Sequence, residues 1–188
     1  MPVNLANSFS VIRVLLIPVF MFFLLEERLL LLGDWLAAGV FMVAAATDTL
    51  DGYFARSRDS VTVFGQFLDP LADKLLISAA LVCLVSLERL SPWIAMIIIA
   101  REFAVSGLRM AAAAEKVVIP ASGLGKIKTF SQIIAIVALI LPGFAYFRGQ
   151  PLSWYLILFA TLVTVISGVD YFRRARLYLD PLDSGHQR

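Results

Sequence analysis

The sequence predicts an all-α integral membrane protein with six transmembrane helices, built as a single domain over residues 1–188. Hydrophobic side chains make up 60% of the chain, and the mean hydropathy is +0.86. A water-soluble domain of this length has too little interior to bury so much apolar surface. The apolar residues also gather in segments of about 20, the length of helix that crosses a hydrocarbon core of roughly 30 Å. The bilayer is therefore the expected solvent.

Short charged turns separate the apolar segments and set the expected order of the helices. The first helix is predicted at about residues 9–25, after a short interfacial piece at 3–7, with Pro18 as a possible kink. The other five are predicted at about 35–55, 70–87, 92–114, 124–141 and 152–173. Small residues are expected to let these helices pack closely, namely alanines 44–46 and 111–114, Gly123 and Gly125.

The basic residues predict the orientation of the bundle. If the helices alternate, one side carries only Arg28, Arg89 and Arg148. The opposite side carries Arg56, Arg58, Arg109, Lys116, Lys126, Lys128, Arg173, Arg174 and Arg176. Because Lys and Arg accumulate in cytoplasmic loops, this second side is predicted to be cytoplasmic, together with both termini. The protein is therefore expected in a cell membrane, as a bacterial inner-membrane protein.

Four aspartates in an otherwise apolar region are the strongest candidates for chemistry. Asp48 and Asp51 are three residues apart, and Asp69 and Asp73 are four apart, so each pair shares one face of a helix. Four carboxylates brought together repel each other unless cations lie between them. Hard oxygen ligands suit Mg²⁺ or Mn²⁺. We therefore expect a polar metal site at the cytoplasmic end of the bundle.

Small residues accompany these acids at fixed spacing. Gly52, Ala55 and Gly65 would let a ligand approach the backbone closely. The whole pattern is Asp48-x2-Asp51-Gly52-x2-Ala55-Arg56-x8-Gly65-x3-Asp69-x3-Asp73. It resembles, without a departure, the signature of the CDP-alcohol phosphatidyltransferases. Aspartates that only cap helices or face water are the alternative interpretation, but four of them at this spacing in a hydrophobic chain argue against it.

Charged residues in the later helices suggest a second, phosphate-binding site. Arg101 and Arg109 lie eight residues apart, on one face of a helix, with Ser106 between them. Lys126 and Lys128 open the following helix. Basic groups near one cytoplasmic opening are suited to a phosphate. Two alternatives stay open: Arg101 and Glu102 form an intramembrane ion pair, or Arg109 and the lysines only set topology.

The resemblance extends over nearly the whole chain and points to one branch of the family. The segments that carry it are Asn7-x2-Ser10-x2-Arg13, Leu68–Leu75, Ile99–Arg109 and Gly125–Thr129. This branch transfers the phosphatidyl group of CDP-diacylglycerol to sn-glycerol 3-phosphate, giving phosphatidylglycerophosphate and CMP. The resemblance also implies two metal ions, a membrane lipid environment and a homodimer.

The resemblance implies a role for each candidate residue. Asp48, Asp51, Asp69 and Asp73 would bind the metal ions, and Asp73 would also act as the catalytic base, although a role as ligand only stays open. The residues expected to bind CDP-diacylglycerol are Asn7, Ser10, Gly52, Ala55, Arg56 and Gly65. Those expected to bind glycerol 3-phosphate are Arg101, Ser106, Arg109, Lys126 and Lys128.

Other functions fit the sequence less well. The same chemistry with phosphatidylglycerol, inositol phosphate or serine as acceptor is the nearest alternative. A divalent-cation transporter would need acids near the membrane midplane, whereas the four aspartates are expected near the cytoplasmic end. A purely structural subunit would not need four buried acids. A net charge of +2 does not suggest a nucleic-acid partner. The single cysteine, Cys83, excludes a disulfide within the chain.

Overall fold

The computed structural model describes residues 5–54, 63–115, 123–141, 146–147 and 150–183. Side chains are described for residues 11–47, 71–72, 74–115, 123–141 and 150–176. The helices are α1 (Leu5–Leu25), the short 3₁₀ turn η1 (Glu27–Leu29), α2 (Leu30–Phe54), α3 (Val63–Ser86), α4 (Pro92–Ala114), α5 (Gly123–Ile140) and α6 (Leu152–Asp183). Two short antiparallel strands, β1 (Tyr146–Phe147) and β2 (Gln150–Pro151), precede α6.

The predicted order of helices is confirmed, and several predicted boundaries are wrong. Helix α4 has the predicted bounds. Helix α3 begins at Val63 and not at residue 70, because Val63, Phe64, Phe67 and Leu68 continue its apolar face at helical spacing. Helix α6 continues to Asp183, since the chain has no glycine or proline between residues 169 and 180. Residues 5–7 belong to α1, which leaves no separate interfacial piece there.

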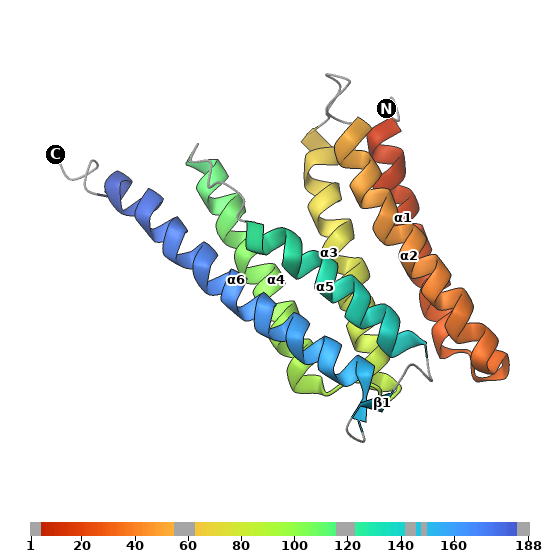
Figure 1. Ribbon diagram of the computed structural model, residues 1–188. Helices are drawn as coiled ribbons and strands as arrows, with labels where there is room; N and C mark the ends of the chain where they lie inside the picture. Colours follow the sequence, from red (N-terminus) through yellow and green to blue (C-terminus); the bar gives the residue numbers. More distant parts are fainter. Residues whose placement is uncertain (1–4, 55–62, 116–122, 142–145, 148–149, 184–188) are drawn as a thin grey trace.

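The helices pack as two groups of three that lie side by side. Helices α1, α2 and α3 contact one another, and α6 packs against both α4 and α5. Contacts of α3 with α4 and α5, and of α2 with α5, join the two groups (Figure 1). The main core contains Phe20 and Phe41, whose ring centroids lie 5.8 Å apart, and the fully buried Leu81, Leu84 and Ile140. Such burial fixes how the helices are rotated against each other.

Small residues explain some of the close approaches. Of the alanines predicted to pack closely, Ala44 and Ala112 are buried and Ala45 is half-buried, whereas Ala46, Ala111, Ala113 and Ala114 are exposed. The same prediction finds no support at Gly123 and Gly125, where an added Cβ would meet no atom of the described residues within 4 Å. Gly33 was not among the residues predicted to allow close packing. A Cβ there would nevertheless lie 2.5 Å from the carbonyl oxygen of Phe23. The first turn of α2 therefore needs a glycine to lie against α1.

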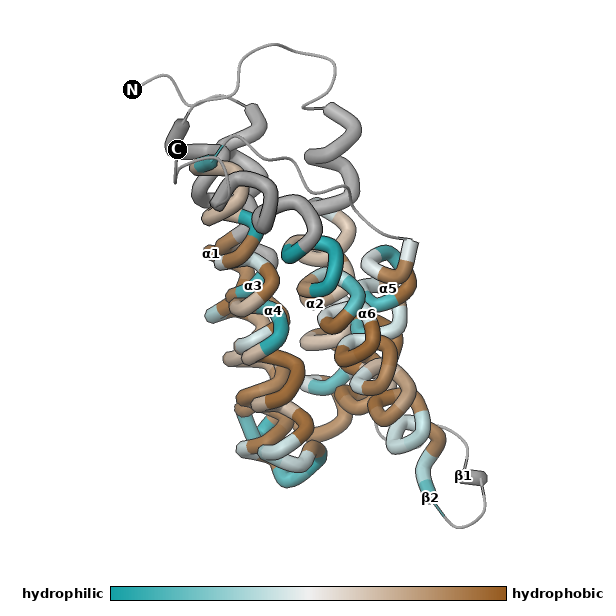
Figure 2. The backbone as a smooth tube through the Cα atoms, turned by 90° about the vertical axis from the view of Figure 1, so that its left-hand side faces the viewer, coloured by the Kyte–Doolittle hydropathy of each residue, from teal (hydrophilic) through white to brown (hydrophobic). Residues whose placement is uncertain are grey.

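Among the residues that the structure describes, three helical segments are long and apolar enough to cross a membrane. They are Glu27–Thr47, Gly123–Ile140 and Leu152–Arg176, and the shorter segments Val11–Leu25 and Lys74–Ser86 are also apolar. Large apolar side chains point outward along the bundle, as expected of a surface that contacts lipid. Hydrophobic positions dominate the bodies of the helices in Figure 2. The protein is therefore a helical membrane protein, and the six-span prediction has support at these three segments.

The turn from α3 to α4 lies at the end of the bundle opposite to the chain termini. Glu88 has a positive φ of 58°, and the amide of Arg89 bonds to the carbonyl of Leu84 at 2.9 Å, which closes the end of α3. The guanidinium of Arg89 donates to both carboxylate oxygens of Asp34, at 2.9 and 3.1 Å, and to the carbonyl of Ile140 at 2.7 Å. This pair of the buried Asp34 and the partly exposed Arg89 links α2, α5 and the turn.

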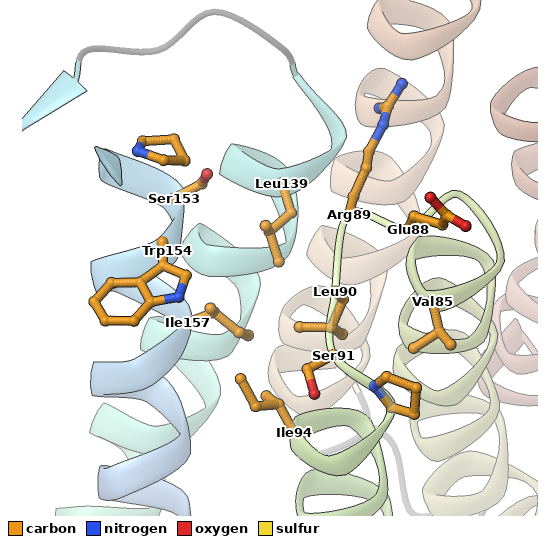
Figure 3. Close-up of a pocket in the computed structure, with 12 residues that line it drawn as sticks. Val85, Glu88, Arg89, Leu90, Ser91, Ile94, Leu139, Ser153, Trp154 and Ile157 are labelled. Carbon is orange, nitrogen blue, oxygen red and sulfur yellow. The ribbon is translucent and has the colours of Figure 1, made fainter. Parts of the chain in front are cut away.

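A cavity of about 610 Å³ lies beside this turn. Leu139, Ile157 and Trp154 supply much of its apolar lining. Figure 3 shows the side chain of Arg89 extending upward beside Glu88, away from Trp154 and Ile157. The arginine's charge is matched by Asp34. The residues that line the cavity include one acid, Glu88, and none of the four aspartates that the predicted chemistry requires.

Candidate active site

The predicted metal residues lie at the end of the bundle that carries the N-terminus. Asp48 and Asp51 are in the last two turns of α2, and Asp69 and Asp73 are in the first three turns of α3. The end of α2 and the start of α3 lie beside each other at the top of Figure 1. The second pair therefore lies further inside its helix than the sequence predicted. These four side chains fall outside the described set, so their convergence stays a prediction.

The predicted nucleotide-binding residues belong to the same end. Asn7 and Ser10 are in the first turns of α1, Gly52 is in the last turn of α2, and Gly65 is in the first turn of α3. Their side chains, where they have one, are also outside the described set. Ala55 and Arg56 lie in residues 55–62, which the structure does not describe.

Arg13 is a described charge that lies close to the first aspartate of α2. The side chain is fully buried between α1 and α2, and its Nε donates to the carbonyl of Ala44 at 3.2 Å. Ala44 precedes Asp48 by four residues, so the two share a face of α2. In the sequence, Arg13 ends one of the segments that carry the family resemblance, and in the structure its hydrogen bond to Ala44 lies one helical turn from the first aspartate.

Glu102 is the centre of a buried ion cluster formed by three helices. Its carboxylate accepts from Lys128 Nζ of α5 at 2.6 Å and lies 3.0 Å from Lys74 Nζ of α3. It also accepts from Nη1 of Arg101, its neighbour on α4, at 3.2 Å. Glu102 and Lys128 are 3% and 5% exposed. The structure therefore brings two predicted acceptor-binding residues, Arg101 and Lys128, to one carboxylate, and the alternative of an Arg101–Glu102 ion pair is confirmed.

Arg101 also contacts helix α6, at Ser167 and Gly168. The Nη2 atom donates to Ser167 Oγ at 2.9 Å. A Cβ added at Gly168 would lie 3.1 Å from Cγ of Arg101 and 3.5 Å from its Nε. The missing side chain of Gly168 lets Arg101 lie across α6. Nε itself is buried and has no hydrogen-bond partner in the part of the chain that the structure describes.

The remaining predicted acceptor residues lie nearer the surface. Arg109 is exposed, and its Cζ lies 5.6 Å from the ring centroid of Tyr171 on α6, a cation–π geometry. Ser106 is half-buried on α4, and Lys126 is exposed in the first turn of α5. Arg101 and Arg109 thus both contact α6, whereas Lys126 is exposed.

Sequence reasoning assigned no role to several residues of this region. They are Lys74, Ser167, Gly168 and Tyr171, together with Gln132 and Thr164, whose side chains hydrogen-bond at 2.9 Å between α5 and α6. A signal was present in the sequence: Thr164, Gly168 and Tyr171 recur at intervals of three and four residues in an apolar helix. That spacing marks a face of α6 that is turned toward protein and not toward lipid.

Acidic groups outside the four aspartates do not form a second metal site in the described residues. No three His, Cys, Asp or Glu side chains among them come close enough to hold a metal ion. The large cavity lies at the other end of the bundle, beside Arg89 and Trp154. The candidate site therefore consists of the aspartate end of α2 and α3 and the ion cluster of α3, α4 and α5, which α6 contacts through Ser167 and Gly168.

Comparison with known proteins identifies the family. The model of the CDP-alcohol phosphatidyltransferase family matches residues 3–166. The chain belongs to this family. Every residue predicted for the site lies inside the matched range.

Individual relatives of the CDP-alcohol phosphatidyltransferase family cover almost the whole chain. A protein of Bacillus subtilis named CDP-diacylglycerol--glycerol-3-phosphate 3-phosphatidyltransferase is 43% identical, over 91% of this chain and 94% of its own. A protein of the same name from Rickettsia felis is 38% identical, over 93% and 97%. A protein of Mycobacterium tuberculosis, named a probable phosphatidylglycerophosphate synthase, is 40% identical, over 92% and 81%.

Proposed function

We propose that the protein transfers the phosphatidyl group of CDP-diacylglycerol to sn-glycerol 3-phosphate and releases CMP. The observation that carries the proposal is the similarity, over more than nine tenths of the chain, to relatives named for this reaction. The basic cluster supports a phosphorylated acceptor, since Arg101, Lys128 and Arg109 supply cationic donors on adjacent helices. The aspartate pattern supports a phosphoryl-transfer reaction.

Asp48, Asp51, Asp69 and Asp73 are the proposed ligands of two divalent metal ions. Their chemistry fits Mg²⁺ or Mn²⁺, because all four offer carboxylate oxygens and none is a thiolate or imidazole. Their placement on adjoining ends of α2 and α3 is consistent with a shared site. When bound, such ions neutralise the charge that develops on the diphosphate as its bond to CMP breaks.

The residues of the chain have separate roles in this proposal. Asp73 takes the proton from the 1-hydroxyl of glycerol 3-phosphate, whose oxygen forms a bond to the phosphorus that carries diacylglycerol. The bond between that phosphorus and CMP breaks, and CMP leaves. The cytidine and diphosphate are bound by Asn7, Ser10, Gly52, Ala55, Arg56 and Gly65. The acceptor phosphate is bound by Arg101, Ser106, Arg109, Lys126 and Lys128.

The arrangement suits a reaction between a lipid and a soluble anion. We propose that the aspartate end faces the cytoplasm of a bacterial cell membrane, where glycerol 3-phosphate is dissolved, as the excess of Lys and Arg on that side supports. The acyl chains of CDP-diacylglycerol stay in the surrounding lipid. The active protein is proposed to be a homodimer.

A panel of acceptors tests the proposal. The protein is purified in detergent and incubated with labelled CDP-diacylglycerol, Mg²⁺, and one of glycerol 3-phosphate, phosphatidylglycerol, inositol phosphate or serine. We expect CMP release that depends on glycerol 3-phosphate, with a phosphorylated lipid product. Consumption of serine or another acceptor without consumption of glycerol 3-phosphate would contradict the assignment.

A further inference from the structure

Glu102 connects the helix that bears Asp73 with the helices that bear the basic residues. Lys74 directly follows Asp73 in α3, and its Nζ lies 3.0 Å from one carboxylate oxygen of Glu102. The other oxygen of Glu102 contacts Arg101 of α4 at 3.2 Å and Lys128 of α5 at 2.6 Å. One carboxylate thus joins three helices where they approach each other.

The burial of these groups makes the contacts strong and directional. Glu102 is 3% exposed, and the Lys128 side chain is 6% exposed. A buried charge is tolerated when it is paired and hydrogen-bonded, and removing one partner leaves the other without compensation. The three cations belong to three different helices: Lys74 to α3, Arg101 to α4 and Lys128 to α5. Their contacts with one carboxylate restrict where the two ammonium groups and the guanidinium can lie.

The cluster also has spare capacity for an anion. Among the described residues, Glu102 is the acid paired with both Arg101 and Lys128. These two cations outnumber their shared acid, and the buried Nε of Arg101 has no acceptor in the described part of the chain. Buried donors without partners are uncommon and are often completed by a ligand, ion or water. A phosphate monoester, with close to two negative charges and several acceptor oxygens, has the matching chemistry.

We propose that Glu102 is a positioning residue for the acceptor phosphate: it holds Lys128 and Arg101 at a fixed separation and ties them to α3 beside Asp73. The proposal rests on the proposed function and deepens it. Glu102 carries the same charge as the phosphate, so it acts through the cations and does not bind the acceptor. Its effect is on the geometry of the acceptor site relative to the catalytic base.

The positioning role and simple electrostatics predict opposite changes in the KM for glycerol 3-phosphate when Glu102 is replaced. Glu102→Gln removes a negative charge, and if Glu102 merely competed with phosphate for the cations, the acceptor would bind more tightly. If Glu102 positions the cations, its removal lets Lys74, Arg101 and Lys128 repel each other and separate. The KM for glycerol 3-phosphate should then rise roughly ten-fold or more, the loss expected for one charge-assisted hydrogen bond to phosphate.

The experiment compares three variants with the wild-type protein in the same detergent. Glu102→Gln removes the carboxylate, and Glu102→Asp keeps it but shortens its reach. Asp34→Asn is the matched control, because Asp34 is also a buried carboxylate paired with an arginine, at the opposite end of the bundle. The KM for glycerol 3-phosphate and the KM for CDP-diacylglycerol are measured for each. The rise in thermal midpoint on adding glycerol 3-phosphate with CMP gives a readout independent of turnover.

The outcomes separate the two proposals. We expect Glu102→Gln to raise the KM for glycerol 3-phosphate and to abolish the thermal stabilisation by glycerol 3-phosphate. Its KM for CDP-diacylglycerol should stay within about two-fold of the wild-type value. For Glu102→Asp, we expect a KM for glycerol 3-phosphate between those of the wild type and Glu102→Gln. An acceptor KM that falls, stays unchanged, or rises no more than in Asp34→Asn would overturn the role of Glu102 while wild-type activity upholds the function. If Glu102→Gln cannot be purified, Glu102→Asp decides by the same criteria. A wild-type protein that ignores glycerol 3-phosphate would overturn both proposals.

Discussion

Gly168→Ala tests whether the position of Arg101 matters to the acceptor. The added Cβ would lie 3.1 Å from Cγ of Arg101 and 3.5 Å from Nε, and ordinary contacts between carbon atoms are about 3.5–4.0 Å. Arg101 must therefore move by several tenths of an ångström. Its bonds to Glu102 at 3.2 Å and Ser167 at 2.9 Å would lengthen or break. Because the guanidinium is displaced and not removed, we expect kcat/KM for glycerol 3-phosphate to fall roughly three- to ten-fold, or about 0.7–1.4 kcal/mol.

The matched control is Gly39→Ala, in the middle of α2. An added Cβ there meets no atom within 4 Å, so the change should stabilise the helix by about 0.5–1 kcal/mol and leave the kinetics unaltered. The assay is CMP release at varied glycerol 3-phosphate, with CDP-diacylglycerol saturating, and then the reverse. Equal kinetics for the two alanine variants would show that the position of Arg101 does not affect the acceptor. An increase in KM for CDP-diacylglycerol alone would contradict the assignment of Arg101 to the acceptor.

Four further predictions follow from the same structure. Asp48→Ala, Asp51→Ala or Asp69→Ala should lower CMP release by roughly three orders of magnitude or more with the protein still in the membrane fraction, and near-normal turnover would exclude a ligand role. Asp73→Asn should reduce turnover far more than it reduces CDP-diacylglycerol binding, measured by equilibrium binding of labelled liponucleotide; equal losses would argue against the base. Arg109→Ala should raise the KM for glycerol 3-phosphate more than that for CDP-diacylglycerol in steady-state kinetics, and the reverse pattern would move this residue to the nucleotide site. Asp34→Asn should lower the free energy of unfolding by roughly 2–4 kcal/mol, less than a fully buried pair because Arg89 is partly exposed, and an unchanged denaturation midpoint would contradict the buried pairing seen here.

The order and nature of the helices could be predicted from the sequence because hydrophobic periodicity and charged turns are local signals. Asp48 and Asp51 were expected near the end of one helix, and they are in the last turns of α2. The start of α3 was less predictable. Pro70 resembles a first-turn residue, yet the helix runs through it from Val63, since the apolar face on both sides of the proline is continuous.

The partners of Glu102 could be predicted only in part. Arg101 is its neighbour in the sequence, and their ion pair was one of the open alternatives. Lys74 and Lys128 join from α3 and α5, 28 and 26 residues away. Whether the two lysines reach Glu102 depends on the relative orientation of α3, α4 and α5. Packing among buried side chains such as Leu76, Ile98 and Gln132 sets that orientation. That orientation has no local sequence signal.

The role of α6 was also not predicted. The sequence pattern gives Gly168 no role, and it predicts close packing at Gly123 and Gly125. Within the part of the chain that the structure describes, a Cβ at Gly168 would meet Arg101, whereas one at Gly123 or Gly125 would meet nothing within 4 Å. A glycine's importance depends on what lies opposite, and its own neighbours in the sequence do not reveal it.

The coupling of bound Mn²⁺ to phosphorus tests the central proposal most directly. Mn²⁺ is added to the purified protein with CDP-diacylglycerol, and pulsed electron–nuclear double resonance at the phosphorus frequency is recorded for wild type and for Asp51→Asn. We expect a phosphorus coupling in the wild-type protein that is lost in Asp51→Asn. Mn²⁺ that binds without any phosphorus coupling, or a coupling that persists unchanged in Asp51→Asn, would contradict a carboxylate-held metal site that contacts the diphosphate.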